Sequence, residues 1–96
     1  MRVSLNRLAR QELRDATDYY QAQNPTLASD FADEIRRCVQ SIRAHPRAAP
    51  LLRDPIRRKL AERFPYAIFY ELRPGVIRIL AIAHAKRKPF YWLGRE

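Results

Sequence analysis

The stretch FPYAIFYELRPGVIRILAIAH, residues 64–84, decides the fold that we expect for this chain. Over residues 66–72, aromatic and aliphatic side chains alternate at a period of two, which is typical of a β-strand. Arg73-Pro74-Gly75 predicts a turn. Residues 76–83 are apolar at nearly every position, which indicates a central strand covered on both faces. The last third of the chain therefore predicts a β-sheet.

Two amphipathic helices are expected before this sheet, and the first covers about residues 7–22. It follows Asn6, which is suited to cap a helix N-terminus. Its apolar side chains recur at steps of three and four residues, as one face of a helix requires. This stripe consists of Ala9, Leu13, Ala16 and Tyr20.

The second helix begins at Asn24-Pro25, where Asn24 can cap and Pro25 fits the first helical position. It is expected to end at His45-Pro46. Its apolar stripe consists of Ala28, Phe31, Ile35, Cys38, Val39 and Ile42. The residues expected to face solvent are Asp30, Asp33, Glu34 and Arg37. Because the link between the helices is so short, they are predicted to form an antiparallel hairpin.

The remaining segments complete an α+β fold. Val3-Ser4-Leu5 and residues 57–60 are candidates for short strands. Residues 46–56 contain three prolines and are predicted to form a loop whose Leu51 and Leu52 pack back onto the core. The two-helix hairpin is then expected to pack on one face of a small, mainly antiparallel sheet. At this length, residues 1–96 are predicted to form a single domain.

The whole chain has a net charge of +9, and its positive charge is concentrated in the second half. Residues 1–46 hold seven Lys or Arg against six Asp or Glu, whereas residues 47–96 hold twelve against four. Such a field attracts polyanions or an acidic protein, although a soluble basic surface without a partner gives the same count. No apolar stretch approaches the ~20 residues of a membrane span, and no secretory signal is visible. We therefore expect a cytoplasmic protein.

Composition excludes several classes of active site. Gly75 and Gly94 are the only glycines, so a glycine-rich phosphate loop is excluded. The histidines, His45 and His84, lie outside metal-ligand spacings, and one cysteine cannot form a multi-cysteine zinc site. Cys38 lies on an apolar helix stripe and is interpreted as a core residue rather than a nucleophile. We therefore expect no metal and no cofactor.

Basic and aromatic residues gather in two segments near the predicted sheet. In Arg57-Arg58-Lys59, strand alternation places Arg57 and Lys59 on one face and Arg58 on the other. Residues 84–92, HAKRKPFYW, directly follow the most apolar strand. Fixed cations can bind phosphate, exposed aromatic rings can stack on bases, and a histidine can act as general acid or base. The same residues can be explained without a functional site. His84 is then an ordinary hydrogen-bonded histidine at a strand end, and the rings of Phe90, Tyr91 and Trp92 pack in the core.

Short motifs along the whole chain have a characteristic order and spacing. They are Glu12-Leu13, Tyr19-Tyr20, Phe31, Ile35, residues 42–46, residues 57–60, residues 64–70, residues 79–84 and residues 87–92. Each motif alone is weakly specific. Together they resemble the RelE/ParE superfamily of bacterial toxins from type II toxin–antitoxin systems, and the wording Phe64-Pro65-Tyr66 is similar to ParE-like members.

The resemblance implies a small cytoplasmic protein, often linked to plasmid stabilisation, that arrests growth when free. It also implies a cognate antitoxin, acidic and partly disordered, whose C-terminal segment wraps the toxin. DNA is then bound at the operator only by the complex with the antitoxin. A strongly basic half-chain is compatible with such a partner.

Two mechanisms occur in the superfamily, and the resemblance favours the ParE-like one. ParE-like members inhibit DNA gyrase without catalysis, whereas RelE-like members are endoribonucleases that cut mRNA on the ribosome. In RelE-like sequences an arginine that binds the scissile phosphate follows the tyrosine equivalent to Tyr66, and here that position is Ala67, which cannot hold a phosphate. A third interpretation is a binding module that has lost its toxicity.

The two mechanisms imply different site residues. As a ribonuclease the chain would use His84, Arg87 and Tyr91. The candidates for binding a target or a phosphate are Arg57, Lys59, Lys86, Arg87, Lys88 and Trp92.

Overall fold

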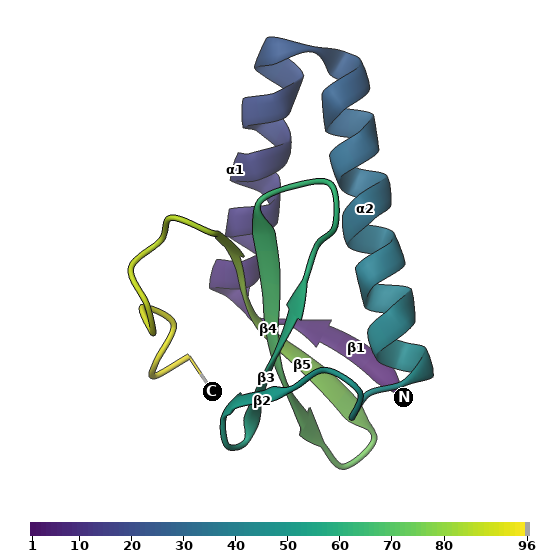
Figure 1. Cartoon of the computed structure of the whole chain (residues 1–96), viewed down its shortest axis with the longest axis vertical. Helices are drawn as coiled ribbons and strands as arrows, with labels where there is room; N and C mark the ends of the chain where they lie inside the picture. The colour runs from purple at the N-terminus through teal and green to yellow at the C-terminus, as the bar shows by residue number, and fades with distance from the viewer. Residues whose placement is uncertain (96) are drawn as a thin grey trace.

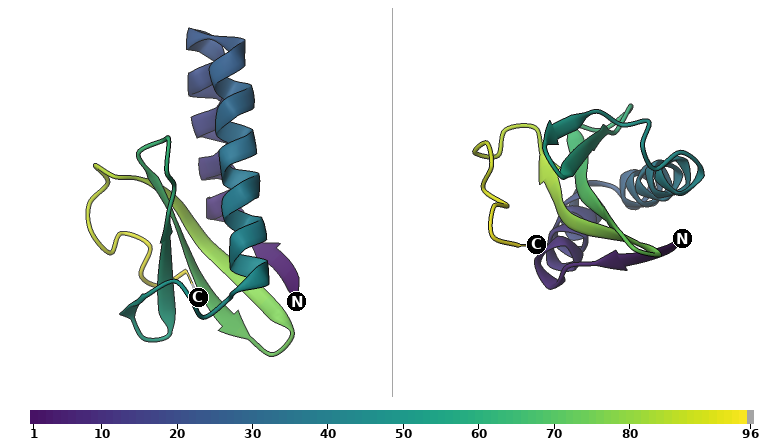
Figure 2. Two further views of the ribbon diagram at one scale, coloured as in Figure 1. Left: turned by 45° about the vertical axis from the view of Figure 1, so that its right-hand side comes forward. Right: turned by 90° about the horizontal axis from the view of Figure 1, so that it is seen from below.

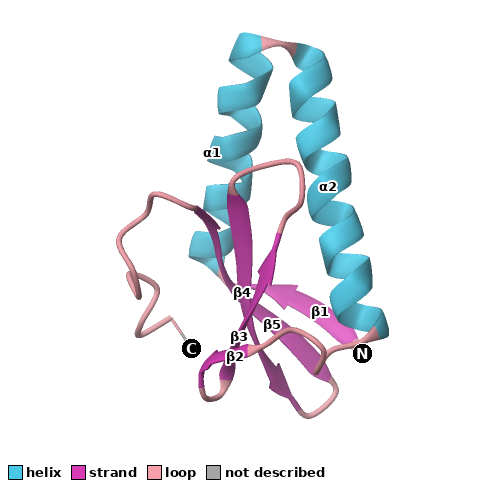
Figure 3. Cartoon of the chain, in the orientation of Figure 1, coloured by secondary structure: helices cyan, strands magenta, loops and turns pink. Residues whose placement is uncertain are grey.

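The computed structural model describes residues 1–95, in seven helices and strands; Glu96, the last residue of the predicted domain, lies outside the described residues (Figures 1 and 3). Their bounds are β1 Arg2–Leu5, α1 Arg7–Gln23, α2 Pro25–Ala44, β2 Leu51–Arg53, β3 Ile56–Leu60, β4 Tyr66–Arg73 and β5 Val76–His84. Both helices and the two long strands are confirmed within a residue or two of the expected bounds. The two short strand candidates are confirmed as β1 and β3.

One five-stranded sheet, in the order β1-β5-β4-β3-β2, forms the centre of the fold. Only β1 runs parallel to its neighbour, and the other described pairs are antiparallel. Both helices cover one face of this sheet, and the segment after β5 crosses the opposite face (Figure 2). The expected α+β architecture, a helical hairpin on a mainly antiparallel sheet, is therefore confirmed.

Local capping fixes both helix starts. The side chain of Asn6 accepts a hydrogen bond from the Leu8 N–H, and that of Asn24 accepts one from the Thr26 N–H. Each cap satisfies a backbone donor that has no partner inside the helix. Because Asn24 also ends α1, the chain reverses at once and the helices lie antiparallel, with their joined ends projecting beyond the sheet (Figure 1).

The strand β5 is covered on both faces, as its continuous apolar sequence predicts. Ile77, Ile79 and Ile82 belong to the core beneath the helices, whereas Leu80 and Ala83 belong to the apolar cluster on the opposite face. The spacing of three residues between Ile79 and Ile82 reflects an irregularity in the pairing with β4, where Phe69 opposes Ala81 and Tyr70 opposes Ile79. This irregularity orients the end of β5 for the site described below.

Two expectations about burial are wrong. Leu51 and Leu52 do not pack onto the core, because residues 51–53 pair with β3 as the outermost strand and leave these side chains 50% and 36% exposed. Glu34, which was expected to face solvent, is only 4% exposed. It lies one turn from Phe31 and Cys38 on the side of α2 that faces the sheet, where the β3–β4 loop supplies a partner for its carboxylate.

Candidate functional site

Residues 85–95, which we call the strap, cross the sheet face that the helices leave open (Figure 2). The strap is anchored by Trp92, which is 1% exposed and packs against Phe69 with ring centroids 5.1 Å apart. Of the two interpretations of Trp92, packing in the core is therefore the one that the structure supports. Its buried ring is not exposed for direct contact with a target, which was its other interpretation.

A groove of about 350 Å³ lies between the strap and the strands β3 and β4; we call it the strap groove. Its apolar lining includes Leu52, Leu60, Phe69, Phe90 and Trp92. The cations Arg58, Arg87 and Lys88 also line it, and none of the three forms an ion pair within residues 1–95. The arrangement suits an apolar segment that carries negative charge.

The run Arg57-Arg58-Lys59 is divided between the two faces of the sheet. Arg57 donates hydrogen bonds to the carbonyls of Arg47 and Ala49, at 3.0 and 2.7 Å, so its guanidinium holds the α2–β2 connection. Lys59 lines a second cavity, of about 270 Å³, whose walls include the end of α2. The predicted alternation is confirmed by the pairing with β4, where Arg57 and Lys59 oppose residues of the core beneath the helices and Arg58 opposes Phe69 of the cluster under the strap. Arg58 lines the strap groove and also borders the second cavity, whereas Arg57 and Lys59 were the expected candidates.

The three residues that a ribonuclease would use all line the strap groove, and each makes a contact within the protein. His84 Nδ1 accepts a hydrogen bond of 3.0 Å from the Lys86 N–H. The guanidinium of Arg87 stacks over the Tyr91 ring, 3.9 Å from its centroid. Burial and the bond to Glu12 raise the pKa of Tyr91 well above the ordinary range of a phenol. Tyr91 therefore acts as a hydrogen-bond donor and is poorly suited to act as a base.

Glu12 is a member of this site that sequence reasoning missed. The sequence assigns Glu12 no place in a site, yet its side chain is only 15% exposed. It accepts hydrogen bonds from the Tyr91 hydroxyl and, at 2.9 Å, from the Arg95 guanidinium. Hydrophobic periodicity identifies only the apolar positions of a helix that face the core. It therefore cannot indicate that the carboxylate of Glu12 reaches the strap.

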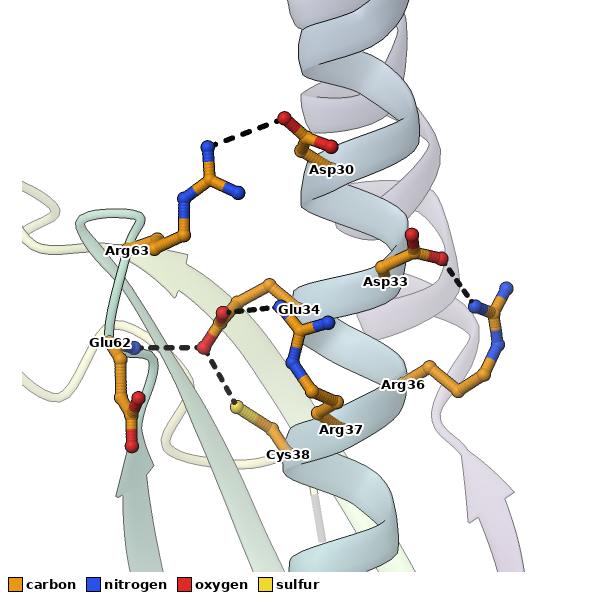
Figure 4. Close-up of polar contacts among 8 residues, drawn as sticks. All are labelled: Asp30, Asp33, Glu34, Arg36, Arg37, Cys38, Glu62 and Arg63. Carbon is orange, nitrogen blue, oxygen red and sulfur yellow. Dashed lines mark hydrogen bonds and ion pairs between the residues drawn. The ribbon is translucent and has the colours of Figure 1, made fainter.

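The wall of the strap groove formed by the β3–β4 loop is held by Glu34 (Figure 4). One carboxylate oxygen accepts a bond of 2.9 Å from the Glu62 N–H, and the other pairs with Arg37 at 3.0 Å. The Glu62 N–H and Arg37 lower the pKa of Glu34, while burial raises the pKa of the Cys38 thiol. Cys38 is buried, as its position on the apolar stripe predicts.

Comparison with known proteins identifies the family. A model described as the ParE toxin of the type II toxin–antitoxin system parDE matches residues 3–89. The chain belongs to the ParE toxin family. Its closeness to ParE-like members, expected from the motifs, is confirmed. No curated protein sequence matches this ParE-family chain.

A solved structure supports the fold of this ParE-family chain. It is titled "Chromosomal ParDE TA system from P. aeruginosa", is 22% identical, and superposes with a TM-score of 0.76 over 88% of this chain and 95% of that one. The strap residues 90–95, including Tyr91, Trp92 and Arg95, lie beyond the part of the chain that matches the family model.

Two further features bear on what this ParE-family toxin can do. Ala67 lies on the floor of the strap groove and is 7% exposed within the apolar cluster of Phe69 and Trp92, so this position offers no charge to a phosphate. Within residues 1–95, no group of His, Cys, Asp or Glu side chains could hold a metal ion. The helices of the same residues are too short or too polar to cross a membrane.

Proposed function

We propose that this chain is a cytoplasmic toxin that arrests growth by binding DNA gyrase without catalysis, and that an acidic antitoxin neutralises it. Membership of the ParE toxin family supports the toxin role. The observation that carries the rest is the strap groove, with its apolar lining and its unpaired cations Arg58, Arg87 and Lys88.

The antitoxin segment is proposed to occupy the strap groove. Leu60 and Phe90 line the groove and are 58% and 40% exposed, which is a large apolar surface for a free protein. A C-terminal segment that is disordered when free can bury this surface as it folds, and its carboxylates can neutralise the cationic residues. The complex, rather than the toxin alone, is proposed to bind operator DNA.

The gyrase contact is proposed to use the exposed cations of the strap. Lys86, Arg87 and Lys88 follow β5 directly and stand in solvent, so they are accessible without a change in fold. The Tyr91 hydroxyl, which is bound to Glu12, and the methyl group of Ala67 favour binding over phosphate cleavage at this end of the strap.

The gyrase proposal is tested with purified toxin in a supercoiling and cleavage-complex assay. The wild type should trap gyrase–DNA cleavage complexes, and the double variant Lys86→Ala/Lys88→Ala should need about tenfold more protein for the same effect. The matched control is Arg10→Ala/Arg14→Ala, which also removes two exposed cations but from α1, and should change potency less than about twofold. Normal supercoiling in excess toxin, with cleaved transcripts after induction, would instead identify a ribonuclease.

The antitoxin proposal needs a separate test with the acidic protein encoded beside the toxin gene. Leu60→Glu places a carboxylate in the strap groove and should weaken the complex at least about tenfold, because it both removes apolar contact and repels an acidic segment. Leu93→Glu makes the same change at a strap residue that is 46% exposed and does not line the groove. Equal effects of the two variants would place the antitoxin elsewhere.

A further inference from the structure

The strand β5 extends beyond its neighbour β1, and this leaves part of its edge without a strand partner. The pairing of β1 with β5 ends at Leu5 opposite Ile79, and the Asn6 N–H makes a last bond to the Ile79 carbonyl. The next polar backbone groups on this edge are the Leu80 carbonyl and the Ile82 N–H, which β1 does not reach. A buried strand edge requires partners for such groups.

Two side chains replace the missing strand. Glu12, from α1, accepts a hydrogen bond of 3.1 Å from the Ile82 N–H. Arg95, from the strap, donates one of 3.2 Å to the Leu80 carbonyl. An ion pair of 2.9 Å joins the two, and their side chains are only 15% and 12% exposed. The end of the strap is therefore attached to the sheet edge through Glu12.

The same carboxylate fixes Tyr91, and Tyr91 in turn fixes Arg87. The second oxygen of Glu12 accepts the Tyr91 hydroxyl. The Tyr91 ring lies between two guanidinium groups, that of Arg87 at 3.9 Å and that of Arg95 at 4.8 Å from its centroid. Each cation is attracted to the electron-rich face of the ring. The orientation of the ring therefore determines where the Arg87 charge stands.

We propose that Glu12 is a positioning residue, which holds the strap on the sheet edge and, through Tyr91, sets the place of Arg87 for recognition of an anionic partner group. The role of Arg87 in recognition rests on the proposed function of the strap cations, whereas the attachment of the strap by Glu12 does not depend on it. Tyr91 and Arg95 lie beyond the family match at residues 3–89, whereas Glu12 and Arg87 lie within it.

A carboxylate is the group that this position needs. Glu12 meets three donors: the Ile82 N–H, the Arg95 guanidinium and the Tyr91 hydroxyl. An ionised carboxylate only accepts and has about four lone-pair positions, whereas an amide of the same shape offers one acceptor oxygen. Glu12→Gln therefore keeps the size of the side chain but removes the ion pair and one acceptor.

The test compares Glu12→Gln with Asp15→Asn in the isolated full-length chain. Asp15 is the matched control, since it lies three residues along α1, is exposed and bonds only to Gln11. Trp92 is the only tryptophan, so its fluorescence reports the strap alone. Glu12→Gln should raise the open-to-closed ratio of the strap about tenfold or more, seen as faster acrylamide quenching and a red shift. Asp15→Asn should match the wild type in both measurements.

A second signal reports Arg87 directly. Because its guanidinium lies over the Tyr91 ring, the Arg87 side-chain protons should resonate upfield in NMR spectra. This ring-current shift should be lost in Glu12→Gln and reduced in Tyr91→Phe, which removes only the hydroxyl. The double variant should lose no more than Glu12→Gln, since Glu12 acts on Arg87 through that hydroxyl.

Unchanged quenching and an unchanged Arg87 shift in Glu12→Gln would overturn the proposal. So would equal changes in Asp15→Asn, or additive losses in the double variant. The resonances of Ile68 and Tyr70, which β4 directs into the core beneath the helices, should stay in place in all variants, which separates a displaced strap from general unfolding. No target is present in these measurements, so a failure of the gyrase proposal would appear only in the cleavage-complex assay.

Discussion

Replacing Glu34 by alanine should lower the free energy of unfolding by about 2–4 kcal/mol. Figure 4 shows the Glu34 carboxylate between α2 and the β3–β4 loop, while its neighbour Asp33 points away from the sheet. The carboxylate accepts a hydrogen bond from the Glu62 N–H, 28 residues further along the chain, and this bond holds the loop against α2. Its side chain is 6% exposed, so water replaces little of what the substitution removes.

The magnitude follows from three contributions. The part-buried Glu62 N–H loses its acceptor, which costs about 1–3 kcal/mol. Loss of one buried methylene group, Cγ, adds roughly 0.8 kcal/mol. The pair with Arg37 adds little, because the Arg37 side chain is 57% exposed and its charge is solvated after the change. For a domain of this size the loss corresponds to a fall in Tm of roughly 10–30 °C.

Urea denaturation, followed by circular dichroism, measures the effect against a matched variant. Asp33→Ala removes an acidic residue from the same turn of α2. Like Glu34, Asp33 pairs with the arginine three positions later, here Arg36 at 2.6 Å, but both side chains of this pair are at least half exposed. It should cost no more than about 0.5 kcal/mol. A Glu34→Ala variant as stable as Asp33→Ala would refute the assignment of Glu34 as the residue that fastens the loop.

The same residue predicts a pH dependence. The pKa of Glu34 is lower in the folded state than in the unfolded chain, because the Glu62 N–H and Arg37 favour the ionised form. Its contribution is therefore complete above the unfolded pKa of about 4.3 and is lost as the pH falls through the lower folded value. The difference in stability between wild type and Glu34→Ala should be constant from pH 6 to 8 and should shrink in acid.

Three further predictions concern buried groups. Tyr70→Phe removes the hydroxyl that donates to the Pro46 carbonyl at 2.7 Å and should cost about 1 kcal/mol in urea denaturation, whereas Tyr19→Phe, at a ring 61% exposed, should be neutral. Burial raises the pKa of the Cys38 thiol and shields its sulfur, so the folded protein should react with a disulfide reagent more slowly at pH 8 than the unfolded protein. Trp92→Ala should cost about 3–5 kcal/mol, and a loss below 1 kcal/mol would mean that the strap is not packed in solution.

The elements that sequence predicts well are those specified by neighbouring residues. Asn6 and Asn24 start helices through bonds to N–H groups two residues away, and these caps lie where the sequence places them. The alternation in Arg57-Arg58-Lys59 is equally local, and it is confirmed. Short-range rules of this kind need no knowledge of the tertiary fold.

The misplaced residues share a different cause. Glu34 is buried because residue 62 approaches it from the β3–β4 loop, and Glu12 is buried because the strap returns over α1. Leu51 is exposed because its strand lies at the sheet edge. Each environment depends on a segment many residues away, so hydrophobic periodicity within one helix or loop cannot indicate it.

The ion pairs within residues 1–95 involve none of the cations that line the strap groove. The acidic residues in ion pairs within the described part of the chain are Glu12, Asp30, Asp33, Glu34 and Glu71. Glu12 binds the strap, Asp30 and Glu34 bind the β3–β4 loop, and Asp33 and Glu71 pair within α2 and β4. The groove cations Arg58, Arg87 and Lys88 form no ion pair within residues 1–95. A partner that brings its own carboxylates therefore meets cations with no internal competitor, and salt screens that attraction over about 10 Å at 0.1 M. The acids that stabilise the fold away from the strap are thus separate from the bases that meet the partner, so they can be varied with those bases intact, whereas Glu12 contacts Tyr91, on whose ring Arg87 stacks.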